Sequence, residues 1–152
     1  IHMEQLCTMS KIDRDPRCRV VAVAYLALMP WDSLSDAEKA DTAHAWWEPV
    51  SKARGLAYDH DEILSIALKR LSSRVTYTTL MMKLMPAEFT LTELEHAYES
   101  ILKTELDKRN FRKKLQKLKL LSPLSKKRMG GKFRPARLYC FSISRVIEIH
   151  VL

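Results

Sequence analysis

Apolar positions along the chain change their spacing near residue 59. Before that point, "RVVAVAYLALM" (19–29) is a continuous apolar run that stops at Pro30, and it predicts a buried strand. "HAWWEPV" (44–50) predicts a second strand, at a sheet edge because Pro49 lacks a backbone donor. The polar residues 32–41 predict a surface loop, and residues 1–3 are left outside the predicted fold.

From residue 59 onward the apolar spacing is helical. "DHDEILSIALKRL" (59–71) predicts a helix that begins at Asp59, and "TTLMMKLM" (78–85) predicts a short helix that ends before a proline. "FTLTELEHAYESIL" (89–102) has the clearest start signal. Its Thr90 and Glu93 are spaced as a capping box, and Phe89 and Leu94 as a hydrophobic staple.

The next helix is predicted over 107–120, with Asp107 as its cap and Phe111, Leu115 and Leu118 on its buried face. The pair of glycines at 130–131 predicts a hairpin tip, and "ARLYCFSI" (136–143) alternates as a strand does. The order of helices followed by a hairpin predicts a winged helix-turn-helix. Residues 143–152 are expected to add a strand or to tail off beyond it.

Charge is strongly segregated along the chain. The net charge is +8, yet residues 1–107 hold twelve Lys/Arg against seventeen Asp/Glu, whereas residues 108–137 hold thirteen Lys/Arg and no acid. Such a block predicts a polyanionic partner, with nucleic acid first and an acidic membrane second. The apolar residues of the block are needed by the core, so a membrane partner is not expected. No apolar run is long enough to span a bilayer, and we expect a cytoplasmic location.

A helix in the major groove needs an apolar underside, an exposed side that reaches base edges, and a second element on the backbone. Helix 107–120 and a wing at 123–139 fit these roles on double-stranded DNA. Arg109 and Arg112 are the candidate guanine readers and Asn110 the adenine reader, while lysines and helix-start threonines would contact phosphates. The predicted DNA-binding residues are Thr76, Thr78, Thr90, Lys108, Arg109, Asn110, Arg112, Lys113, Lys117, Lys126, Lys127, Arg128, Lys132, Arg134 and Arg137.

The sequence offers little for catalysis or metal binding. Three cysteines without close spacing indicate free thiols in a reducing compartment, and no histidine pairs with them at zinc-site spacing. With three glycines in all, a glycine-rich phosphate loop has almost nothing to be built from. We therefore expect no cofactor, no metal and no enzymatic activity.

Several stretches of residues 56–141 closely resemble the C-terminal region of the Nudix-related transcriptional regulators (NrtR), which are bacterial repressors of NAD-metabolism genes. They are "LAYDHDEILSIALKRL", "YTTL", "FTLTELEHAYESIL", "LDKRNFRKKLQKLKLL" and "RPARLYCF". "RDPRCRVVAVAYLALMP" and "AWWEPV" resemble the second half of the family's Nudix-like domain, whereas its Nudix box is absent. The chain is thus expected to be a fragment that starts within that domain.

The resemblance implies an α+β fold. A partial Nudix-like α/β sensor domain would occupy 4–55, a winged helix 56–142, and an extension 143–152. It also implies that the protein binds a palindromic operator as a dimer and that ADP-ribose or a related nucleotide releases it from the DNA.

Arg17, Arg19 and Trp47 are the candidate effector-binding residues, through a pyrophosphate and an adenine ring. A solvated strand entry for the arginines and a core or interface role for the tryptophan are the alternatives. Half of the sensor pocket would be missing from a fragment. A Nudix hydrolase acting on ADP-ribose-type nucleotides with a helical appendage, and an RNA-binding or adaptor winged helix, are the other functions considered.

Overall fold

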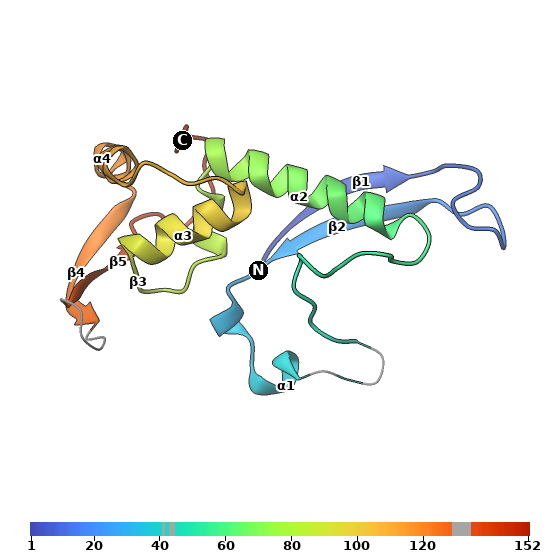
Figure 1. Ribbon diagram of the computed structural model, residues 1–152, viewed down its shortest axis with the longest axis horizontal. Coiled ribbons are helices and arrows are strands. Elements are labelled where there is room, and N and C mark those ends of the chain that lie inside the picture. Colours follow the sequence, from blue (N-terminus) through green and yellow to red (C-terminus); the bar gives the residue numbers. More distant parts are fainter. Residues whose placement is uncertain (41, 43–44, 129–134) are drawn as a thin grey trace. The chain divides into compact units, whose positions relative to one another are not determined.

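The computed structural model describes residues 1–40, 42, 45–128 and 135–152. These residues form two compact units, Ile1–Arg70 and Leu71–Leu152. The division falls inside helix α2 (His60–Tyr77), which is drawn in green in Figure 1. The sequence indicated a domain boundary at residue 55, before this helix.

The first unit contains a two-stranded antiparallel sheet. Strand β1 (His2–Met9) pairs with β2 (Ala22–Leu28), with Met3 opposite Ala27 and Met9 opposite Ala22. Strand β1 was not predicted, and it begins within the three residues that were left outside the fold. Strand β2 lies inside the predicted strand 19–29, but the expectation of full burial is wrong, because Val23 and Tyr25 are exposed. On one face of this sheet, Met3, Val23 and Tyr25 are exposed.

The predicted edge strand at 44–50 is not a strand over its described residues, 45–50. Pro49 instead accepts two turn hydrogen bonds through its carbonyl, from the backbone N–H groups of Lys52 and Ala53. The preceding segment, predicted as a loop, holds a 3₁₀ turn (Trp31–Ser33) and the one-turn helix α1 (Asp36–Lys39).

The second unit is the winged helix that the sequence predicted. After α2 come the 3₁₀ helix η2 (Leu80–Lys83), strand β3 (Phe89–Thr90), α3 (Leu91–Leu102), α4 (Lys108–Leu118), β4 (Leu121–Arg128) and β5 (Ala136–Phe141). The strands form an antiparallel sheet in the order β3-β5-β4. Helix α2 runs on past residue 71, and the helix predicted at 78–85 is reduced to η2. The predicted hairpin tip at Gly130 and Gly131 lies outside the described residues.

The core of this unit is assembled from the end of α2, η2, α3, α4, the sheet and the C-terminal segment. Phe89 and Leu94, the predicted staple pair, are both fully buried. Residues 143–152 do not extend past the domain. The backbone N–H groups of Ile149 and Val151 donate to the carbonyls of Tyr77 and Thr76, both at 2.8 Å, and Val151 lies in the core. The buried core residues are Val75, Met81, Met85, Phe89, Leu94, Tyr98, Phe111, Leu115, Leu120 and Val151.

Candidate nucleic-acid interface

Helix α4 begins and ends at identifiable caps. The carboxylate of Asp107 accepts a hydrogen bond from the backbone N–H of Asn110 at 2.7 Å, as expected for an N-cap. Lys119 ends the helix in the left-handed conformation, with φ at 52°. The helix is two residues shorter at its C-terminal end than the predicted range 107–120.

The underside of α4 is apolar, as its spacing indicated. Phe111 is 4% exposed and Leu115 is 3% exposed, and Leu118 is half-buried against the same core. The ring of Phe111 meets that of Tyr98 edge to face, with centroids 5.3 Å apart. These contacts fix one side of the helix to the domain, so its other side faces outward.

The outward side of α4 is cationic. Two shallow hollows flank it, with volumes of about 490 and 320 Å³. Lys108, Arg109, Arg112, Lys113 and Gln116 line the first hollow, and Asn110, Lys113, Lys114, Lys117 and Leu118 line the second. Predicted DNA-binding residues Lys108, Arg109, Asn110, Lys113 and Lys117 are exposed here. The structure therefore brings the α4 candidates together on one surface.

Arg112, the sixth of the α4 candidates, is held against α3. Its Nη2 donates to the hydroxyl of Thr92 at 3.3 Å and lies 3.7 Å from a carboxylate oxygen of Glu95. The ammonium of Lys108 lies 3.6 Å from the other oxygen of Glu95. Within the described parts of the chain, no carboxylate pairs with Arg109. The two arginines predicted as guanine readers thus have different surroundings.

Basic residues of the wing also have acidic partners. Lys126 Nζ donates to the carboxylate of Glu88 at 2.9 Å, and Arg128 donates to Glu93. Both pairs are substantially exposed, and such pairs contribute little to stability. Lys127 and Arg137 are exposed and lie opposite one another on β4 and β5. Lys132 and Arg134, also predicted, lie outside the described residues.

The three threonines predicted to contact phosphates have their hydroxyls engaged within the protein. Thr90 caps α3 by accepting from the backbone N–H of Glu93 at 3.2 Å. Thr78 donates to the carbonyl of Arg74 and accepts from the backbone N–H of Leu80, and it is 1% exposed. Thr76 donates to the carbonyl of Ser73. Thr78 and Thr90 are both buried, and their hydroxyls contribute to the end of α2 and the start of α3.

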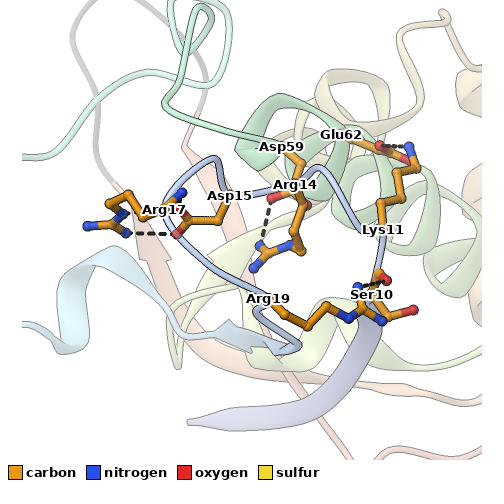
Figure 2. A network of polar contacts seen from close by, with 8 residues as sticks. All are labelled: Ser10, Lys11, Arg14, Asp15, Arg17, Arg19, Asp59 and Glu62. Atoms are coloured by element: carbon orange, nitrogen blue, oxygen red, sulfur yellow. Dashed lines mark hydrogen bonds and ion pairs between the residues drawn. The ribbon is translucent and has the colours of Figure 1, made fainter.

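The effector-binding candidates lie in the first unit. Figure 2 shows Arg17 and Arg19 on the loop that joins β1 to β2. Arg17 forms a two-point hydrogen bond with Asp15 and stacks on the ring of Tyr58, while Arg19 donates to the carbonyl of Ser10. Trp47 instead donates through its indole N–H to the carbonyl of Glu38 and meets the ring of Trp31 at 5.2 Å.

The same loop is attached to the start of α2. Arg14 donates two hydrogen bonds to the carboxylate of Asp59, both at 2.8 Å, and Lys11 donates to Glu62 at 2.7 Å (Figure 2). The guanidinium lowers the pKa of Asp59 through these hydrogen bonds. The hydrogen bonds from Arg17 lower the pKa of Asp15 to about 2. Both carboxylates are thus ionised at neutral pH.

Acidic residues around α4 and the wing were missed by the sequence reasoning. Glu88, Glu93 and Glu95 supply the partners of four predicted DNA-binding residues. The sequence did contain a signal for one of them. Glu95 lies on the apolar face of α3 beside Leu94, and a carboxylate at such a position indicates a buried charge that needs a partner. Its partners could not be identified without the placement of α4.

The described residues contain neither a membrane-spanning helix nor a cluster of metal-ligating side chains. No helix among them is long and apolar enough to cross a membrane. In those same stretches, no cluster of three or more His, Cys, Asp or Glu side chains is arranged to hold a metal ion.

Comparison with known proteins identifies relatives over most of the chain. Residues 81–141 match the family described as the NrtR DNA-binding winged helix domain. The ADPR responsive transcriptional repressor NtrR of Acinetobacter baylyi is 35% identical over 144 residues, which cover 93% of this chain and 57% of that protein.

Two solved structures share the fold. Shewanella oneidensis NrtR complexed with a 27mer DNA superposes with a TM-score of 0.82 at 31% identity, covering 93% of this chain and 64% of that one. A MutT/nudix family protein from Enterococcus faecalis matches in fold, with a TM-score of 0.66 at 23% identity over 93% of this chain and 62% of that one. The predicted fold class, a winged helix following part of a Nudix-like domain, is confirmed. The chain spans somewhat less than two thirds of each relative.

Proposed function

We propose that this chain is a sequence-specific DNA-binding transcriptional repressor, because residues 81–141 match the family described as the NrtR DNA-binding winged helix domain. The observation that carries the proposal is the two-sided helix α4, which buries Phe111 and Leu115 and exposes a row of cations. The relative from A. baylyi is named a repressor, and the S. oneidensis relative was crystallised with DNA.

In the proposed complex, α4 lies in the major groove and the wing contacts the backbone. Arg109 is the guanine reader, because a guanidinium can donate to both acceptors of that base. Asn110 would read adenine through its amide, and the lysines of α4 would contact phosphates. Lys126 and Arg128 would exchange Glu88 and Glu93 for phosphates, since their present ion pairs are exposed.

We also propose that an ADP-ribose-type nucleotide releases the DNA and that the regulated genes belong to NAD metabolism. The support is the name of the A. baylyi relative, of which this chain spans 57%. Arg17 and Arg19 are the candidate phosphate ligands, and Trp47 the candidate for stacking on adenine. Binding of DNA and of this effector would place the protein in the bacterial cytoplasm.

A homodimer on a palindromic operator is the proposed assembly. The first unit leaves Met3, Val23 and Tyr25 exposed on its short sheet, and an apolar sheet face of this kind favours association. Light scattering at micromolar concentration tests this, and a monodisperse monomer would contradict it.

Nudix-type hydrolysis is the second candidate, and the fold likeness to the E. faecalis protein is the observation that favours it. We propose binding rather than catalysis, since the relatives above with more than 30% identity over the matched residues are a protein named a repressor and a protein crystallised with DNA. An assay of ADP-ribose cleavage with magnesium separates the two, and turnover by the purified chain would favour the enzyme.

Selection of duplexes from a random pool tests the main proposal. We expect the chain to enrich one palindromic motif and to release the enriched duplex when ADP-ribose is added. Recovery of the unselected pool composition would contradict sequence-specific binding, whereas enrichment that ADP-ribose does not reverse would contradict only the proposed effector.

A further inference from the structure

Glu95 is a buried carboxylate beneath α4. It lies on α3, and its side chain is 0% exposed. Among the described residues, neither of its carboxylate oxygens has a hydrogen-bond partner. An ionised carboxylate is costly to remove from water unless positive charges and hydrogen bonds compensate. The presence of this group therefore calls for an explanation other than packing.

Two cations of α4 provide the compensation. Lys108 lies 3.6 Å from one oxygen of Glu95, and Arg112 lies 3.7 Å from the other. The two basic residues are four positions apart, so they are neighbours on one face of the helix. The carboxylate of Glu95 thus contacts one cationic side chain in each of the first two turns of α4.

Arg112 is held at a second point. Its Nη2 also donates to the hydroxyl of Thr92, which lies one turn before Glu95 on α3. Its Nε is buried, while its side chain as a whole remains 42% exposed. The guanidinium is therefore fixed in orientation and still reachable from the surface where DNA is proposed to bind.

We propose that Glu95 is a positioning residue for sequence discrimination, which fixes Lys108 and Arg112 on the DNA-facing side of α4. This inference rests on the proposed function. Long cationic side chains that are not held attach to phosphates of any sequence, and that attraction dominates non-specific affinity. Groups held in place lose less freedom on binding and accept fewer geometries. Glu95 thus suppresses non-specific binding and favours the matching sequence.

Glu95→Gln tests the inference, because it retains the shape of the side chain and removes its charge. The probes are a duplex selected by the wild-type chain from a random pool and a shuffled duplex of equal composition, each titrated at several salt concentrations. We expect the ratio of the two affinities to fall about tenfold. Binding of the shuffled duplex should strengthen, with a salt slope steeper by about 0.9 for each cation released to a phosphate.

Glu105→Gln is the matched control. It makes the same charge change at an exposed position just before α4, and in the described part of the chain Glu105 forms no ion pair with that helix. The affinity ratio should stay at the wild-type value. An equal fall in this control would overturn the inference, because net charge alone would then explain the result.

Thr92→Val keeps the test valid if Glu95→Gln does not fold. Thr92 is exposed, so removal of its hydroxyl frees one attachment of Arg112 without disturbing the core. A smaller fall in the affinity ratio is expected. An unchanged ratio in the folded variants, or equal losses for both duplexes, would overturn the role of Glu95. If the wild-type chain selects no duplex at all, it is the proposed function that fails.

Discussion

At the scale of single residues, chemistry alone does not distinguish Arg109 from Arg112. Both are arginines of α4 and both line the same hollow. Arg112 is held by Thr92 and Glu95, whereas Arg109 is exposed with no carboxylate partner among the described residues. Arg109 can therefore direct all of its donors to a base edge, and Arg112 has part of its hydrogen-bonding capacity engaged already.

Arg109→Ala should weaken binding to a selected duplex by roughly 1–3 kcal/mol, the usual contribution of one bidentate contact to a base. Binding to shuffled DNA should fall much less, and the free energy of unfolding should change by less than about 0.5 kcal/mol, because the side chain is exposed. Fluorescence anisotropy and urea denaturation measure the two effects. Lys69→Ala is the control, since it removes an exposed helix cation from the first unit. Equal losses for both duplexes would mean that Arg109 does not read sequence.

Phe111→Ala should lower the free energy of unfolding by about 3–5 kcal/mol. The ring is 4% exposed and packs edge to face on Tyr98, so its removal leaves a cavity beneath α4. Chemical denaturation gives the value. A loss below about 1 kcal/mol would show that α4 is not anchored through this side chain, since that is close to what a single buried methylene group contributes.

At this scale, the sequence predicted the features of a residue that depend on its neighbours along the chain, and it did not predict contacts with distant segments. The apolar underside of α4 followed from helical spacing, and Phe111 and Leu115 are buried as expected. The cations followed from composition. The partners of Arg112 lie about twenty residues away on another helix, and no periodicity places them there.

At the scale of elements, helix starts were set by short-range chemistry. Thr90 and Glu93 form both hydrogen bonds of the capping box that their spacing indicated, and α3 begins directly after Thr90. The hydroxyl oxygen of Thr90 therefore accepts a backbone hydrogen bond in the folded protein, which assigns this residue to the stability of α3. The predicted phosphate contact would use the O–H of the same group as a donor.

Thr90→Ala tests that assignment. We expect a loss of about 1 kcal/mol in the free energy of unfolding, as for other N-cap replacements. The salt dependence of DNA binding should not change, because no phosphate contact is lost. A salt slope reduced by about 0.9 at unchanged stability would instead support the phosphate contact.

Acid should detach the β1–β2 loop from the start of α2. The pKa of Asp59 is lowered by its hydrogen bonds with Arg14, so the contact stabilises the folded state above the ordinary carboxyl pKa of about 4. The stabilisation is lost as the pH falls through the lowered pKa. The Arg14 Nε–H signal in NMR should stay protected from exchange at pH 5 and lose that protection on further acidification.

Asp59→Asn is the control for this acid effect, because it removes the titrating group. The variant should show weak protection of the Arg14 Nε–H at every pH. Loss of protection in the wild-type chain above pH 6, well outside the range of a carboxyl with a lowered pKa, would contradict the assignment.

Elements whose pairing is long-range were predicted less well. "HAWWEPV" has strand-like residues, but over residues 45–50 it forms no strand and Pro49 begins a turn. In strand β1 only Leu6 and Met9 are buried. Two buried positions are too few to indicate a strand from the sequence alone. The C-terminal segment became part of the core because it hydrogen bonds to the end of α2.

At the scale of the whole molecule, charge is divided between the regions of the chain. The acids lie almost entirely before residue 108, yet Glu88, Glu93 and Glu95 reach the basic block in the folded protein. In the proposed DNA complex these carboxylates would reduce the attraction to phosphates in general, because each lies beside a cation of the proposed interface. The basic block indicates a polyanionic partner, and under the proposed function the acids packed beside it would affect selectivity.

The central claim is that α4 occupies the major groove, and methylation interference with dimethyl sulfate on a selected duplex tests it most directly. The reagent methylates guanine at N7 in the major groove and adenine at N3 in the minor groove. Our account predicts that guanine N7 methylation blocks binding and that Arg109→Ala abolishes the effect at one guanine of each half-site. Interference confined to adenine N3, or none at either groove, would contradict it.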